Sequence, residues 1–388
     1  DAPGSGDSLV LEFKNSSGDW NTIDTFTTLN NPITDKFTFY SYPVNQNQYL
    51  YDGFQFRFTN YTLRSGNLDH WHLDYVKLAV GDGTSFLTDI AFTEVPNPIL
   101  KNYTSMPWWH FVTNKSEEIP ASDSFNEIHM YSHDDEDQAI TPTEVELIEM
   151  ETGTVVLDDI ALFQSATNFS PGFLNDDFPT PPSTTYPTFT NAINSAFADD
   201  LKYLEFDITK FKKNYSINVD NEAVSFNPIV KDNNIVTHTT IFDNYFAYDD
   251  GTAESGIEAT KKDVQLALKF HANVADSLKA VQIHFPHIFA NTSTQNFTLK
   301  VWIGELDNSP EYEGFLQKPI YIDSYLDSLN GFSTYLLKDA NSGELTPLAI
   351  PVGNFYVGWQ QVSNCSLNEC IAIGIDKSKT DGMKNLFF

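Results

Sequence analysis

Two short motifs near the start of the chain carry residue types that could catalyse acyl transfer. Residues 6–9 read GDSL, which makes Ser8 a candidate nucleophile, and residues 69–72 read DHWH, which supplies Asp69 and His72. Nucleophilic catalysis by serine requires a histidine base within hydrogen-bond reach and an acidic group that orients the histidine. The two motifs therefore raise an esterase hypothesis.

The elements expected around Ser8 argue against that hypothesis. A nucleophilic serine of this kind lies on a sharp turn that leads from a strand into a helix. Here the polar stretch DAPGSG precedes Ser8, and the run LVLEF follows it. Alternating apolar residues predict a strand, so the order of elements is inverted. We expect no enzyme activity from this chain.

The DHWH motif has a simpler interpretation as part of a strand that spans residues 68–80. One face of that strand would carry the core residues Trp71, Leu73 and Tyr75. The other face would carry the polar residues His70, His72 and Asp74. Side chains two apart on a strand project the same way, so the histidines could share a metal. Packing of the apolar face in a core is the favoured interpretation.

An acidic turn near residue 250 is the preferred candidate for a metal site. Its oxygen-bearing side chains are Asp249, Asp250, Thr252 and Glu254. Asp376 ends the last predicted strand, and first and last strands are often neighbours in jelly-rolls. Carboxylate and carbonyl oxygens suit calcium. The candidate ligands of a structural calcium ion are Asp249, Asp250, Glu254 and Asp376, and a turn whose carboxylates are only solvated is the favoured interpretation.

Other polar and aromatic runs are weaker candidates. The run HDDEDQ, residues 133–138, is a second possible calcium site or simply a solvated loop. Trp108 and Trp109 could stack on sugar rings, although a core at the junction of two domains is the favoured role. No phosphate-binding loop, dinucleotide-binding glycine pattern or HExxH motif occurs.

The two cysteines, Cys365 and Cys370, occur in the run NCSLNEC. Their spacing does not match a zinc site, which takes two pairs of cysteines or additional histidines. A disulfide that closes a short loop is expected instead, and such bonds persist in oxidising compartments.

Composition limits the class of protein and its partners. The chain has 388 residues, of which 41% are hydrophobic and 14% aromatic, so it can bury cores and favours strands over helices. The formal net charge of −31 disfavours binding to nucleic acid or to an anionic membrane. No apolar run reaches the roughly 20 residues that a spanning helix needs.

Turn residues divide the chain into three expected all-β domains made of tandem antiparallel sandwiches. Residues 1–98 contain strand patterns such as 9–15, 36–44, 51–61 and 68–80, separated by turns. Residues 99–240 contain a second β unit with a Pro/Thr-rich loop, and residues 241–388 contain seven or more short strands. The first unit shows too few strands for a closed sandwich, so we expect further strands before Asp1.

The motifs taken together resemble those of large secreted surface proteins of Bacteroidota. GDSLVLEF and YLYDGFQFRFTNY resemble an N-terminal jelly-roll similar to MAM-like adhesion domains. LKNYTSMPWWHF resembles the segment that leads into an immunoglobulin-like domain. FDNYFAYDDGTAESG, LKVWIG, FYVGWQQ and IAIGIDK resemble a second jelly-roll. The resemblance covers nearly the whole chain and is weakest between about 115 and 235.

The resemblance implies an exported cell-surface protein that is cargo of the type IX secretion system, although the C-terminal sorting domain of such cargo is absent from this chain. It implies a non-catalytic role in binding, adhesion or scaffolding, with other cell-surface or outer-membrane proteins, or glycans, as partners. Two alternatives stay open. The chain could be a subunit of an outer-membrane complex, which predicts a large apolar interface. It could also be a carbohydrate-binding accessory region of a secreted hydrolase, which predicts an exposed aromatic platform.

Overall fold

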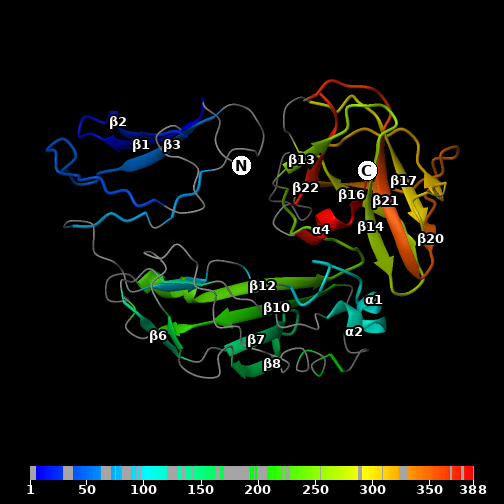
Figure 1. Ribbon diagram of the computed structural model, residues 1–388, viewed down its shortest axis with the longest axis horizontal. Coiled ribbons are helices and arrows are strands. Elements are labelled where there is room, and N and C mark those ends of the chain that lie inside the picture. Colours follow the sequence, from blue (N-terminus) through cyan, green and yellow to red (C-terminus); the bar gives the residue numbers. More distant parts are fainter. Residues whose placement is uncertain are drawn as a thin grey trace.

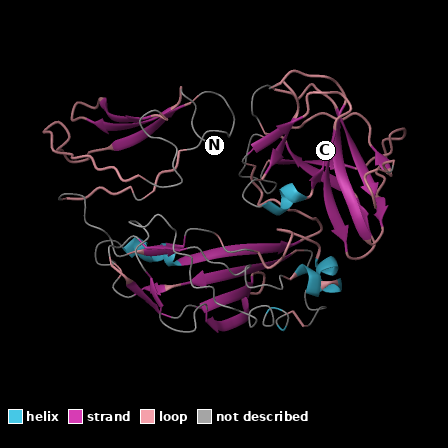
Figure 2. Cartoon of the chain, viewed as in Figure 1, coloured by secondary structure: helices cyan, strands magenta, loops and turns pink. Residues whose placement is uncertain are grey.

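The computed structural model consists of antiparallel β-sheets joined by turns, with a few short helices (Figure 2). The all-β class predicted from the sequence is therefore confirmed. The structure describes residues 6–28, 38–62, 71–74, 76–80, 89–92, 95, 98–119, 130–132, 136–141, 144–161, 167–169, 193, 195, 197–198, 208–219, 222, 228–253, 255–286, 291–307, 309–322, 331–367, 369–376 and 380–387.

The first sheet places β1 (Ser8–Lys14) between β2 (Trp20–Phe26) and β3 (Phe56–Tyr61). Alternate residues of β1 face one hydrophobic cluster, as the pattern of LVLEF predicts. This N-terminal core consists of Leu9, Leu11, Phe13, Phe26 and Tyr49. The predicted strand at 9–15 is therefore confirmed.

The second region is organised around a four-stranded sheet. Its order is β12 (Ile235–Phe242), β10 (Thr209–Ser216), β7 (Glu144–Glu149) and β8 (Thr154–Ala161). A smaller sheet has the order β11 (Asn218–Val219), β6 (Gln138–Thr141) and β9 (Thr167–Phe169). Separately, β4 (Ile90–Phe92) pairs with β5 (Met130–Ser132), and the 3-10 helix η2 spans Pro228–Asn234.

Two short helices, which the strand-rich composition does not predict, also lie in this region. They are α1 (Trp108–Thr113) and α2 (Lys115–Glu118). Trp108 and Phe111 are three residues apart, so they share one helix face. Both are buried in a cluster with Phe197, Phe211 and Phe242, which we call the middle core. Tertiary packing, rather than helix propensity, accounts for α1.

The third region contains a five-stranded sheet and three two-stranded pairs (Figure 1). The sheet order is β18 (Tyr312–Glu313), β17 (Phe297–Ile303), β21 (Gly353–Gln361), β14 (Gln265–Ala272) and β23 (Leu386–Phe387). The pairs are β13 (Ser255–Glu258) with β22 (Ala372–Ile375), β16 (Ala280–His284) with β19 (Phe332–Leu336), and β15 (Asp276–Leu278) with β20 (Leu348–Ile350). The short helix α4 (Thr380–Lys384) precedes β23.

These strands enclose a cluster that we call the C-terminal core. It includes Phe297, Leu299, Val301, Tyr335 and Trp359. The central strands β17 and β21 are buried along most of their length, as expected for strands with neighbours on both sides. No helix among the described residues is long and apolar enough to cross a membrane.

Two strands predicted from the sequence are not formed where the structure describes them. Residues 38–44, and residues 71–74 and 76–80, carry no strand ladder. Trp71 packs at the edge of the N-terminal core, but Leu73 is 50% exposed, so its predicted burial is wrong. Alternating apolar residues indicate that a segment could form a strand, but they do not show whether a neighbouring strand is present to pair with it. Asp69, His70 and Tyr75 lie outside the described residues.

Candidate functional site at the junction of the middle and C-terminal cores

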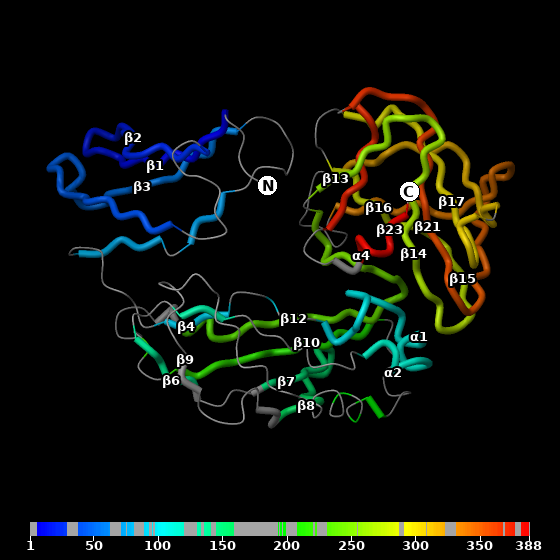
Figure 3. The backbone as a smooth tube through the Cα atoms, viewed as in Figure 1, coloured from blue at the N-terminus to red at the C-terminus, as the bar shows by residue number. Residues whose placement is uncertain are grey.

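The chain that follows β12 leads into β13 and the third region (Figure 3). Aromatic side chains along it connect the middle core to the C-terminal core. The Tyr103 ring lies 5.3 Å from Phe246 and 4.8 Å from Tyr248, measured between centroids. Phe270 of β14 lies 5.4 Å from Tyr248 and 5.5 Å from Phe355 of β21. Phe246 and Phe270 pack against both cores. We call this region the junction.

A polar network beside these rings joins α1 to the turn between β14 and β15. His110 Nε2 lies 3.1 Å from Asp276 Oδ2, and the indole Nε1 of Trp109 donates to the same oxygen at 2.9 Å. On the other side of the imidazole, the backbone N–H of Asn273 donates to Nδ1 at 3.1 Å. The His110 side chain is fully buried. Each contact spans more than 160 positions of sequence.

Asn273 extends the network to a buried carboxylate on α2. Its side-chain amide donates to Oε1 of Glu118 at 2.7 Å and to the backbone oxygen of His110 at 3.2 Å. Glu118 is 5% exposed, and its Oε2 has no hydrogen-bond partner among the described residues. Burial raises the pKa of the Glu118 carboxyl, and the hydrogen bond from Asn273 opposes that rise.

Competing effects also set the pKa values of the other two titratable groups of the network, His110 and Asp276. Burial lowers the pKa of His110, and its interaction with Asp276 only partly offsets this. Burial alone would raise the pKa of Asp276, but hydrogen bonds from the Ser277 N–H, Trp109 and His110 outweigh it and lower that pKa. The network therefore combines a neutral imidazole with an ionised carboxylate at neutral pH.

An open pocket of about 210 Å³ lies at the junction. Its lining residues come from both sides of the junction and are Asn102, Tyr103, Tyr248, Lys269, Phe270, His271, Asn354 and Asn385. Three carboxamides, a lysine and a histidine supply both donors and acceptors. His271 and Asn354 already contact each other, with Nδ1 and Oδ1 2.9 Å apart.

The two adjacent tryptophans have different environments. Trp108 is 4% exposed and packs inside the middle core. Trp109 is 40% exposed and anchors its indole nitrogen to Asp276 across the junction. The Trp108 ring stacks on Phe211 inside the core, whereas the Trp109 ring lies 6.2 Å from the ring of His110 and is tilted by 44° to it.

The acidic turn brings together several of the residues predicted to bind calcium. The Asp250 N–H donates to Asp376 Oδ2 at 2.9 Å, and β13 pairs with β22, so the start and end of this region are neighbours. Thr252 donates to Asp250 Oδ1 through its hydroxyl at 2.7 Å. Burial is the chief cause that raises the pKa of Asp249, with Asp376 and Asp250 adding to it. Glu254 lies outside the described residues.

The remaining candidates are positioned as follows. Ser8 opens β1 opposite Tyr61, in a strand rather than on a strand-to-helix turn. His72 and Asp74 lie in a described segment without helix or strand, and Glu136 precedes β6, whereas residues 133–135 are not described. Within the described ranges, no group of three or more His, Cys, Asp or Glu side chains is arranged to hold a metal ion.

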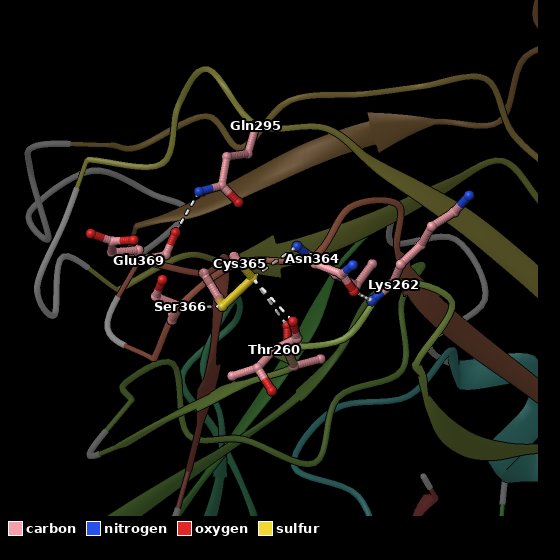
Figure 4. Close-up of a disulfide and its surroundings, with 10 residues drawn as sticks. Thr260, Lys262, Gln295, Asn364, Cys365, Ser366 and Glu369 are labelled. Carbon is pink, nitrogen blue, oxygen red and sulfur yellow. Dashed lines mark hydrogen bonds between the residues drawn. A yellow bond between two sulfur atoms is a disulfide. The ribbon is translucent and has the colours of Figure 1, made fainter.

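Cys365 and Cys370 form a disulfide that closes the loop between β21 and β22 (Figure 4). The Cys365 N–H donates to the backbone oxygen of Thr260 at 3.1 Å, and Gln295 donates to the backbone oxygen of Glu369. Cys370 is 3% exposed. The bond therefore ties this loop to two other segments at the edge of the C-terminal core.

Sequence reasoning missed the residues that make the junction network, namely His110, Glu118, Asn273 and Asp276. No motif marks them, because partners that are far apart in sequence leave no local spacing. Comparison of the chain with known proteins finds no matching family model, no matching curated protein and no matching solved structure.

Proposed function

We propose that this chain is a non-catalytic extracellular protein that acts in binding or adhesion, or as a structural scaffold, at a cell surface. The observation that supports this best is the junction. Its acid–base groups, His110, Asp276 and Glu118, are occupied in holding α1 and α2 to the β14–β15 turn. A framework whose parts are fixed to one another can present its loops to a partner.

Location outside the cell is supported by the disulfide, since such bonds are rare in reducing compartments. The net charge of −31 makes nucleic acid an unfavourable partner. Export as type IX cargo, and three sandwiches with boundaries near 98 and 240, belong to the proposal on the strength of the sequence motifs. Expected partners are other cell-surface or outer-membrane proteins, or glycans.

One observation favours a second candidate, a carbohydrate-binding accessory region. The junction pocket, of about 210 Å³, combines amide, imidazole and ammonium groups that can form hydrogen bonds with sugar hydroxyls. The other alternative, a subunit of an outer-membrane complex, would show itself by stable co-purification with membrane proteins.

Calcium at the acidic turn forms part of the proposal. The Asp250 N–H donates to Asp376 Oδ2, and the carboxylate oxygens near β13 and β22 would gain a shared counterion. Added calcium should raise the melting temperature of the wild-type chain, and Asp376→Asn should remove most of that rise. An equal rise in both proteins would argue against binding at this turn.

The proposed function is tested by binding and hydrolysis assays on the full chain. Fluorescently labelled protein should bind intact cells or a glycan array saturably, and excess unlabelled protein should displace it. Hydrolysis of p-nitrophenyl esters should be negligible and equal in wild type and Ser8→Ala. Saturable ester hydrolysis that Ser8→Ala abolishes would replace the binding function by the esterase hypothesis.

A further inference from the structure

Both ring nitrogens of the buried His110 are committed to partners, which leaves no place for a second proton. Nδ1 accepts the backbone N–H of Asn273 at 3.1 Å, and Nε2 lies 3.1 Å from Asp276 Oδ2. A backbone N–H can only donate, so the neutral ring must hold its hydrogen on Nε2 and donate it to Asp276. In a doubly protonated ring, Nδ1–H would point at the Asn273 N–H.

The two partners of the imidazole belong to the other side of the junction. His110 lies in α1, which packs in the middle core, whereas Asn273 follows β14 and Asp276 begins β15. The His110 side chain has no solvent exposure, so water cannot replace a lost partner without movement of the elements. Protonation of this one ring is thereby coupled to the contact between the two cores.

We propose that His110 is a proton-sensitive latch that holds α1 on the β14–β15 turn while its ring is neutral and releases that contact when Nδ1 takes up a proton. This inference goes beyond the proposed function, because it concerns how the junction responds to acid and holds whatever the protein binds. A surface protein with such a latch would change the relation between its middle and C-terminal parts in an acidified environment.

The direction in which pH changes the stability of the junction follows from the lowered pKa of the His110 imidazole. Burial lowers the pKa of His110 in the folded chain below its ordinary value. The released state therefore binds the proton more tightly than the latched state. The His110 latch stabilises the contact between α1 and the β14–β15 turn fully above about pH 6.5, the ordinary pKa of histidine. This stabilisation is lost as the pH falls below that value.

Other ionisable groups face His110 or its partners and modify this response. They are Asp276, His271, Glu118, Lys101 and Glu117. The Asp276 carboxylate favours the charged imidazole and partly opposes the lowering of the His110 pKa, whereas His271 lowers that pKa further. Glu118 acts in the opposite sense to His110, because its raised pKa makes the folded chain take up a proton on acidification. Glu118→Gln should therefore enlarge the acid response.

The test compares the full chain with His110→Gln, whose amide can still donate to Asp276 but cannot take up a proton. His271→Gln is the matched control, because His271 is an exposed histidine of the same junction. Amide hydrogen exchange of peptides covering residues 106–114 and 270–278 is measured between pH 7.5 and 5.0 and corrected for intrinsic rates. Wild type should lose protection by about tenfold at pH 5.0, His271→Gln should lose slightly less, because His271 adds to the lowering of the His110 pKa, and His110→Gln should lose none.

Two results would overturn the latch. One is an equal loss of protection in wild type and His110→Gln, and the other is unchanged protection in wild type across the pH range. Should His110→Gln fail to fold, nitrogen chemical shifts of the wild-type ring decide the matter. They should show Nδ1 without hydrogen at pH 7.5, and a hydrogen on Nδ1 at that pH would contradict the proposal.

Discussion

Replacing Asp276 with alanine removes the acceptor of two side-chain donors, and the structure indicates that only one loss is costly. The indole of Trp109 is 40% exposed, so water can replace the carboxylate. The Nε2–H of His110 belongs to a side chain with no exposure, so it would stay buried without an acceptor. A buried unsatisfied donor costs about 1–3 kcal/mol. Asp276→Ala should therefore weaken the junction by about 2 kcal/mol.

Local opening is the appropriate quantity to measure, because a chain with several cores need not unfold in one step. A loss of about 2 kcal/mol corresponds to roughly thirtyfold faster amide exchange in peptides that cover residues 106–114. Trp109→Phe is the matched control, since it removes only the exposed donor, and its effect should be below about threefold. Asp276→Asn keeps an acceptor oxygen and should fall between the two.

Two results would contradict the role given to the hydrogen bond between His110 and Asp276. Exchange in Asp276→Ala that stays within about twofold of wild type would mean that the His110 hydrogen bond does not hold the junction. An effect of Trp109→Phe as large as that of Asp276→Ala would mean that the exposed indole contact carries the stability. Either result would also remove the structural basis of the latch.

Three further predictions concern the cores. Gly358→Ala should destabilise the C-terminal sheet by about 1–3 kcal/mol, seen as a lower urea midpoint, because its Cβ would lie 2.6 Å from the Trp302 ring. Trp108→Ala should cost about 3–5 kcal/mol in the same assay, whereas Trp109→Ala should cost far less, since only Trp108 fills the middle core. Cys365→Ser opens a loop with a sequence separation of 5 and should lower stability by about 2 kcal/mol, a loss that reduction of the wild type should reproduce.

The sequence predicted the strands that are both periodic and central. The runs around Leu9, Val301 and Tyr356 form β1, β17 and β21, because alternation and β-branched or aromatic residues favour a half-buried or fully buried strand. It failed for residues 68–80, where the same alternation occurs but the described residues have no ladder. It also missed α1, since Trp, Phe, Val and Thr are poor local indicators of a helix.

Local pattern therefore determined the all-β class, the main strands and the short cysteine loop, because each depends on neighbours a few residues apart. The junction was decided only by tertiary structure. His110 and Asp276 are 166 positions apart, and the tautomer of the imidazole depends on a backbone N–H that no residue type encodes. Burial, which turns that contact into a proton-sensitive one, exists only once the two cores have packed together.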